Sequence, residues 1–179
     1  MAVDYIVASL PALSFDQPAP IAWEKFQSII EGTALCRGGE GAATPAEATR
    51  SGGAPASTSM NWPETWRDLE TQLKNAVAEA RGGEKYKRAA EGCSLYWKNK
   101  VLACFQEKDP LKRDEALDRV WWEAAGELTP PSAPLGEGAL ATYAIRLKIA
   151  LKRSAISRDR GNAAFDRLTS GPRESLGVQ

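Results

Sequence analysis

The chain has 179 residues, enough for one domain with a substantial core. Its 23 Lys and Arg balance 23 Asp and Glu, and 43% of the residues are hydrophobic, which is typical of a folded globular protein. There is no histidine, so catalytic sites of the Ser-His-Asp, Cys-His and HExxH kinds are excluded. We therefore expect no enzyme, no metal and no cofactor.

Amino-acid usage favours helices over strands, because 29 Ala and 16 Leu stand against 13 Val and Ile together. The three cysteines, Cys36, Cys93 and Cys104, are an odd number without a CxxC pair, so we expect reduced thiols in a cytoplasmic protein. Cys93 and Cys104 fall on one predicted helix face, where packing in the core is favoured over catalysis. No apolar run approaches the roughly 20 residues of a membrane span, and no secretory signal is expected.

Composition divides the chain into four segments. Residues 37–59 contain 19 Gly, Ala, Ser, Thr or Pro among 23 residues, so burial cannot offset the entropy of ordering them. A flexible linker is therefore predicted over 37–60. It separates an N-terminal segment, 1–36, from a helical domain, 61–170, and a disordered tail follows at 171–179.

The N-terminal segment contains two short elements. Residues 3–10 fit a short strand or a helical turn equally well, since periodicity does not decide so short a run. A helix is predicted from Ile21 to about Glu31, with Gly32 ending it.

Five helices are predicted for the main body, from the three- and four-residue spacing of apolar side chains. The first begins at an Asn61 cap with Glu64 three residues on and ends at Gly82. A later one begins at Asp109 and Pro110, which read as N-cap and first helical residue. The predicted ranges are 61–82, 84–107, 109–126, 139–157 and 160–169. The expected fold is all-α, an irregular bundle of about five to six helices with antiparallel neighbours.

Two groups of side chains resemble functional groups, and we interpret both as structural. Asp114, Glu115 and Asp118 lie beside basic residues, which indicates a solvated ion-pair face rather than paired catalytic acids. Four of the six tryptophans fall on predicted core stripes: Trp62, Trp66, Trp97 and Trp121. Trp122 neighbours Trp121 and points elsewhere, so it is the candidate exposed aromatic.

The helix over 139–157 is apolar on two sides. One face carries Leu140, Tyr143, Ala144, Leu147 and Leu151. The other carries Ile145, Ile149 and Ile156, with Lys148 and Lys152 on one edge and Arg146 and Arg153 on the other. Such a helix is either sandwiched within its own bundle or covered by a partner. The candidate partner-binding residues are Trp122, Ile145, Arg146, Lys148, Ile149, Lys152, Arg153 and Ile156.

Charge is distributed unevenly along the chain. Residues 139–179 hold 8 Lys and Arg against 3 Asp and Glu, a net charge of +5, and residues 1–138 hold 15 against 20, a net charge of −5. A basic region of this kind is able to bind nucleic acid, an anionic lipid surface or an acidic protein surface. No nucleic-acid-binding motif accompanies it, so nucleic acid is the weaker expectation.

Three stretches carry a family resemblance: DYIVASLPALSFDQPAP near the start, WRDLETQLKNAVAEAR in the middle, and LGEGALATYAIRLKIALKR with RGNAAFDRLTS near the end. They resemble an uncharacterised bacterial family whose genes accompany V-type ATPase operons. Its members open with A-S-L-P-x-L-x-F, here within Tyr5 to Phe15. They end with L-x-x-Y-x-x-x-L, here Leu140 to Leu147, followed by G-x-x-x-F, here Gly161 to Phe165.

The family is similar to the V/A-type ATPase C subunit, also called d, an all-helical socket between the rotor stalk and the membrane ring. The resemblance implies a non-catalytic subunit or assembly factor in the cytoplasm, peripheral to the membrane, with V-type ATPase subunits as partners. The alternative is a small helical binding module that uses its basic C-terminal region for nucleic acid or an anionic surface. The oligomeric state stays open.

Overall fold

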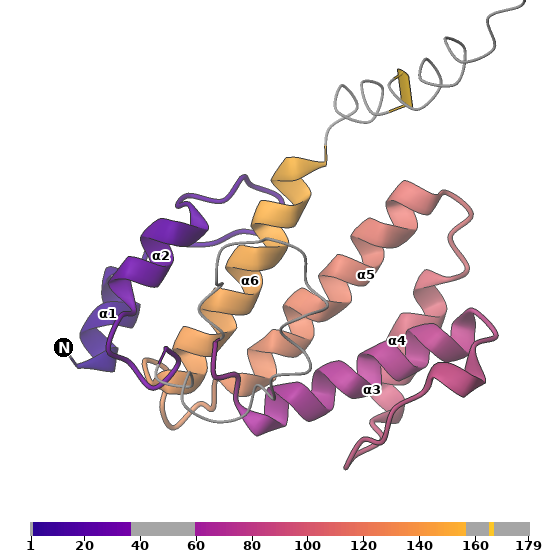
Figure 1. Ribbon diagram of the computed structural model, residues 1–179, viewed down its shortest axis with the longest axis horizontal. Helices are drawn as coiled ribbons and strands as arrows, with labels where there is room; N and C mark the ends of the chain where they lie inside the picture. The colour runs from indigo at the N-terminus through magenta and orange to yellow at the C-terminus, as the bar shows by residue number, and fades with distance from the viewer. Residues whose placement is uncertain (1, 37–59, 157–164, 167–179) are drawn as a thin grey trace, which may run out of the picture.

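The computed structural model describes residues 2–36, 60–156 and 165–166, and within them the chain forms six α-helices and no strand (Figure 1). The predicted all-α irregular bundle is confirmed. The helices are α1 (Val3–Ser9), α2 (Trp23–Ile29), α3 (Glu64–Ala80), α4 (Leu95–Cys104), α5 (Pro110–Ala125) and α6 (Glu137–Ala155). Two short 3₁₀ helices, η1 (Glu84–Tyr86) and η2 (Gly126–Leu128), join them. The predicted tail lies outside the described residues, and so does the predicted linker except for Met60. Of the predicted 160–169 helix, only Phe165 and Asp166 are described.

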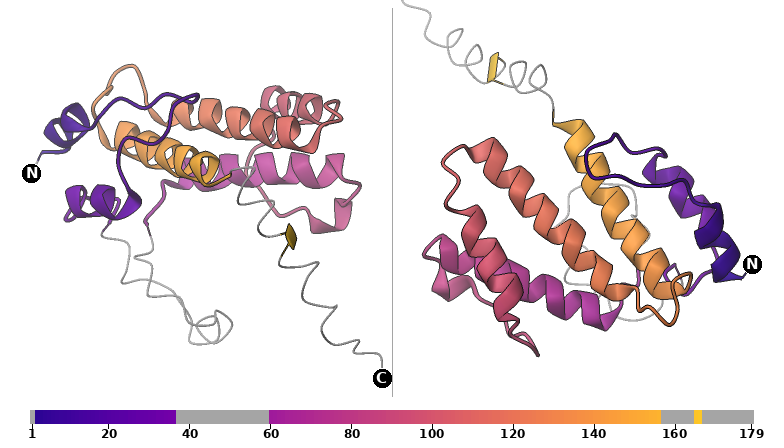
Figure 2. Two further views of the ribbon diagram at one scale, coloured as in Figure 1. Left: turned by 90° about the horizontal axis from the view of Figure 1, so that it is seen from above. Right: turned by 180° about the vertical axis from the view of Figure 1, so that it is seen from behind.

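Helix α6 lies between two groups of helices (Figures 1 and 2). It contacts α1 and α2 on one side and α5 on the other, and it runs alongside α5 in the opposite direction. On the far side of α5 lie α3 and α4, which contact α5 and each other. The antiparallel arrangement follows from the short connection through η2 and the loop before α6.

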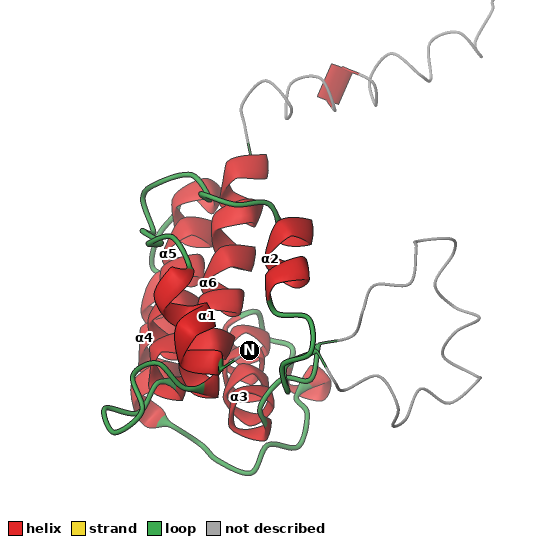
Figure 3. Cartoon of the chain, turned by 90° about the vertical axis from the view of Figure 1, so that its left-hand side faces the viewer, coloured by secondary structure: helices red, strands yellow, loops and turns green. Residues whose placement is uncertain are grey.

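The N-terminal segment covers the first apolar face of α6 (Figure 3). Residues 3–10, for which strand and helix were both open, form α1, and its Ile6 is buried. Phe26 and Leu147 are completely buried in the same cluster, which also contains Leu140. Full burial of one such side chain stabilises a fold by about 1.5–3 kcal/mol. This face of α6 is therefore covered as its periodicity predicts.

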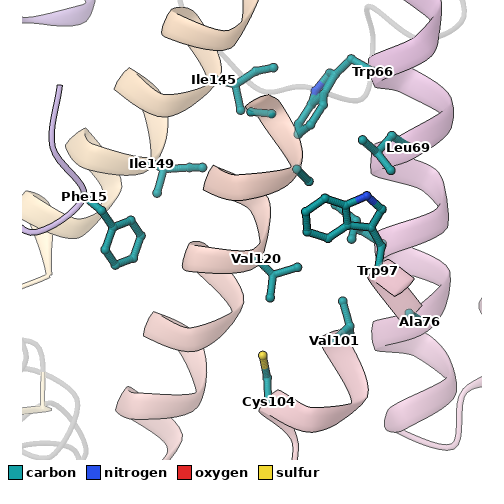
Figure 4. Close-up of a cluster of buried hydrophobic side chains, with 13 residues drawn as sticks. Phe15, Trp66, Leu69, Ala76, Trp97, Val101, Cys104, Val120, Ile145 and Ile149 are labelled. Atoms are coloured by element: carbon teal, nitrogen blue, oxygen red, sulfur yellow. The ribbon is translucent and has the colours of Figure 1, made fainter. Parts of the chain in front are cut away.

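A second hydrophobic cluster joins α3, α4, α5 and the opposite face of α6 (Figure 4). Trp66 and Trp97 are buried in it, as predicted, and Val120 lies near its centre. Ile145 and Ile149 enter it from α6 with 5% and 8% of their surface exposed. Ile145 and Ile149 are therefore covered by the chain's own bundle, which is the first of the two alternatives that the sequence left open for this helix. Ile156 differs, being the residue after the helix and 48% exposed.

The predicted helix over 84–107 is wrong for its first half. Only η1 and α4 are helical, and residues 87–94 form an irregular segment along α3. Asn75 on α3 donates to the carbonyl of Arg88 and accepts from its backbone N–H, both at 2.8 Å. The backbone of Ser94 likewise donates to Gln72 Oε1 at 2.8 Å. Side chains of α3 therefore bond to backbone groups of this segment, which would be paired within the helix if the segment were helical.

This irregular segment changes the environment of one cysteine. Cys93 precedes α4 and is exposed, so its predicted burial on a shared helix face is wrong. Cys104 is buried as predicted, and its Sγ lies 3.2 Å from the carbonyl oxygen of Lys100. All three cysteines are free thiols.

Two predicted helix-end signals, Asp109 and Gly82, are confirmed and a third, Asn61, is wrong. Asp109 caps α5 by accepting from Leu111 N–H at 2.9 Å, with Pro110 at the first helical position. Gly82 ends α3 in the left-handed conformation, φ +71°, as a C-terminal glycine does. Asn61 is not the cap of α3, because the helix begins after Pro63 and no side chain caps it.

The start of α6 packs directly against η2. A Cβ atom added to Gly138 would lie 1.9 Å from the carbonyl oxygen of Leu128. Thr142 fixes the same crossing, because its hydroxyl donates to the carbonyl of Ala125 at 2.7 Å. The position of α6 on α5 therefore depends on a residue without a side chain.

Replacing Gly138 by Ala should lower the free energy of unfolding by about 1–3 kcal/mol, because backbone must move to admit the methyl group. Gly136→Ala is the matched control, since its Cβ would meet atoms no closer than 3.4 Å. Urea unfolding of both variants checks this. Equal stability of the two variants would contradict the close crossing of α6 and η2.

Candidate functional site

An open groove of about 530 Å³ lies between α3, α5 and α6. Its lining combines apolar side chains from all three helices with a charged rim. The lining residues are Lys74 and Val77 of α3, Asp114, Leu117, Asp118 and Trp121 of α5, and Lys148, Ile149 and Lys152 of α6. Such a combination of apolar surface and a few charged groups is typical of binding sites.

Helical spacing explains why these side chains share one groove. Leu117 and Trp121 are four residues apart and follow one stripe of α5. Lys148 and Lys152 are related in the same way on α6. Because α5 contacts both α3 and α6, its stripe lies between the other two helices. The apolar side chains of the groove are continuous with the core cluster that contains Ile149.

Lys148 has no ion pair within the part of the chain that the structure describes. Its Nζ lies instead 4.7 Å from the ring centre of Trp23 and 4.9 Å from that of Trp62. Partial burial lowers the pKa of Lys148, and the charge of Glu70 opposes this shift. The ammonium group of Lys148 is therefore stabilised by aromatic rings at the groove and has no ion pair among the described residues.

Asp118 is buried, with only 8% of its surface exposed. Its Oδ1 accepts from Lys152 Nζ at 2.7 Å, and Lys152 also lies 3.0 Å from Asp114 Oδ2. Asp118 Oδ2 is buried and has no hydrogen-bond partner among the described residues. Burial raises the pKa of Asp118, although Lys152 acts in the opposite direction. The predicted solvated face is thus wrong for Asp118, because α6 covers this residue.

The other edge of α6 meets the N-terminal segment. Trp122 packs edge-on against Phe15, with ring centres 5.5 Å apart. Arg146 Nε donates to the carbonyl of Trp122 at 3.1 Å. The guanidinium of Arg153 lies 4.0 Å from the centre of the Phe15 ring and pairs with Glu115 at 3.2 Å. Trp122 is partly buried, so its predicted exposure is wrong, because Phe15 covers one edge of the indole.

The predicted partner-binding residues therefore do not form one surface. Lys148, Ile149 and Lys152 line the groove. On the other edge, Trp122 and Arg153 contact Phe15, and Arg146 contacts Trp122. Ile145 lies in the core and Ile156 is exposed at the end of α6. The sequence patterns missed the contributions of α3 and α5, because Leu117 and Trp121 look like ordinary core residues until the helices are placed.

Two of the three cysteines, Cys36 and Cys104, offer little nucleophilic chemistry. Burial raises the pKa of the Cys36 and Cys104 thiols, which keeps them protonated at neutral pH. In the described ranges no cluster of three or more His, Cys, Asp or Glu is placed to hold a metal ion. None of the described helices is long and apolar enough to cross a membrane.

Comparison of the chain with protein-family models, curated proteins and solved structures finds no match.

Asp118→Asn should raise the free energy of unfolding at neutral pH and change it little in acid. Because the folded pKa of Asp118 is raised above 3.8, the native protein loses stability as the pH rises from 3.8 through the raised value. Asparagine does not titrate, and Lys152 keeps Asp114 as a partner. Urea unfolding near pH 7 and below pH 3.8 measures the difference.

The matched control is Asp114→Asn, which removes the exposed partner of Lys152 and keeps the buried one. It should give no stabilisation near pH 7. The account of Asp118 fails if Asp118→Asn is no more stable than the native chain near pH 7.

Proposed function

We propose that this chain is a non-catalytic helical adaptor of a bacterial V-type ATPase, a C-subunit-like subunit or an accessory factor in the cytoplasm. The observation that carries the proposal is the placement of the motif residues that resemble this family. Leu13 of the opening motif packs in the same cluster as Leu140, Tyr143 and Leu147 of the α6 motif. Segments distant in the sequence thus meet through the residues that carry the resemblance.

A binding role is further supported by the open groove. Its apolar lining and charged rim suit a polypeptide partner, whereas the protonated thiols of Cys36 and Cys104 and the absence of histidine offer little catalytic chemistry. A polypeptide is also favoured over nucleic acid by the pairing of the basic residues. Lys152 and Arg153 already pair with carboxylates, and Arg146 hydrogen-bonds to Trp122.

Affinity purification of the tagged full chain from its native cell tests the proposal. Rotary ATPase subunits should be enriched well above the level recovered with the tag alone. A second purification through a tagged catalytic subunit shows whether the complex survives extraction. The proposal is overturned if the complex survives and this chain neither retrieves it nor is retrieved with it.

The nucleic-acid alternative predicts a different result. Duplex DNA would be bound with an affinity that falls steeply with salt and weakens when Arg146, Lys148, Lys152 and Arg153 are neutralised. An electrophoretic mobility shift across a salt series measures this. We expect no specific shift at physiological salt.

A further inference from the structure

We propose that the groove between α3, α5 and α6 binds an amphipathic helix of a partner protein, whose apolar side chains contact Leu117, Trp121 and Ile149 and whose carboxylate pairs with Lys148. This inference rests on the proposed adaptor function and names the surface and the partner chemistry. It uses helix-in-groove recognition, in which anchors recur every three or four residues.

The shape of the groove favours a polypeptide over a small molecule. Its volume of about 530 Å³ is enough for several side chains. A small molecule is held where most of its surface becomes buried, whereas this groove is open along one side between three helices. A helix laid along it leaves its polar face in water and buries only its apolar stripe.

The apolar lining supplies anchor points. Val77, Leu117 and Trp121 are only partly buried in the chain alone, although they pack against the core cluster. A partner would remove their remaining surface from water, which is favourable at about 25 cal/mol per Å² of apolar area. Trp121 is also of the residue type that most often contributes a large share of binding energy at protein interfaces.

One lysine of the groove favours a partner segment that carries a carboxylate. Lys74 pairs with Glu70 at 2.9 Å, and Lys152 pairs with Asp114 and Asp118. Lys148 alone among the three lysines of the groove lacks a carboxylate within the described residues, and desolvation lowers its pKa. A carboxylate from the partner would give Lys148 the ion pair that Lys74 and Lys152 already have.

Two synthetic helical peptides test this with the purified full chain. Both carry leucine at positions i, i+3, i+4 and i+7. One has glutamate flanking the leucines, and the other has lysine at the same positions. Fluorescence anisotropy of labelled peptide should show the acidic peptide binding about tenfold more tightly than the basic one.

Lys148→Glu should reverse this preference, and Leu117→Asp should abolish binding of the acidic peptide. Lys112→Glu is the matched control, because it makes the same charge change on α5 at an exposed residue outside the groove. It should leave a clear preference for the acidic peptide. Circular dichroism during thermal unfolding confirms that each variant is folded.

Several results would overturn the proposal. Binding of neither peptide, equal binding of both, or the same effect of Lys148→Glu and Lys112→Glu each contradicts it. Sedimentation equilibrium showing a dimer that Leu117→Asp dissociates would assign the groove to a second copy of the chain instead.

The peptide titration needs no ATPase subunit, so it succeeds or fails independently of the proposed function. Conversely, the Lys148→Glu and Leu117→Asp chains can be used in the affinity purification. If the native chain retrieves ATPase subunits and both variants retrieve them equally well, the adaptor function stands and the groove is not its docking surface.

Discussion

Helix α6 is apolar on two sides, and both sides must be covered for the chain to fold. Burial in one cluster with α1 and α2 and in another with α3, α4 and α5 meets this requirement. Neither cluster is complete without α6, which contributes Leu140 and Leu147 to one and Ile145 and Ile149 to the other. The N-terminal segment is therefore part of the same core as the rest of the bundle, although 37–59 separate it from α3 in the sequence.

The two covered faces leave two edges of α6, and each edge carries a pair of cations. Arg146 and Arg153 point toward Trp122 and Phe15, where they help to hold the N-terminal segment on α5. Lys148 Nζ lies over the rings of Trp23 and Trp62, and Lys152 pairs with Asp114 and Asp118 of α5. Both lysines line the open groove that α3 also borders. The arginine edge is thus covered by the N-terminal segment, whereas the lysine edge borders the open groove. The same periodicity that places α6 in the core also forms the groove.

The sequence predicts the helices whose apolar spacing is long and regular, including α3, α5 and both faces of α6. It does not predict the irregular segment 87–94, because its backbone hydrogen bonds go to Asn75 and Gln72 on another helix. Burial of Asp118 likewise depends on where α6 crosses α5. The sequence predicts only part of the candidate site for the same reason. Its α6 residues follow from periodicity, whereas its α5 and α3 residues depend on how three helices pack.

Amide hydrogen exchange along α6 in the full chain tests the sandwich most directly. Helices covered on both faces open only with the whole fold, so they exchange slowest. The amides between Leu140 and Ala150 should be among the slowest in the protein and should exchange at the rate of global unfolding. Exchange of this stretch as fast as that of α1, with α3 and α5 still protected, would contradict the central position of α6.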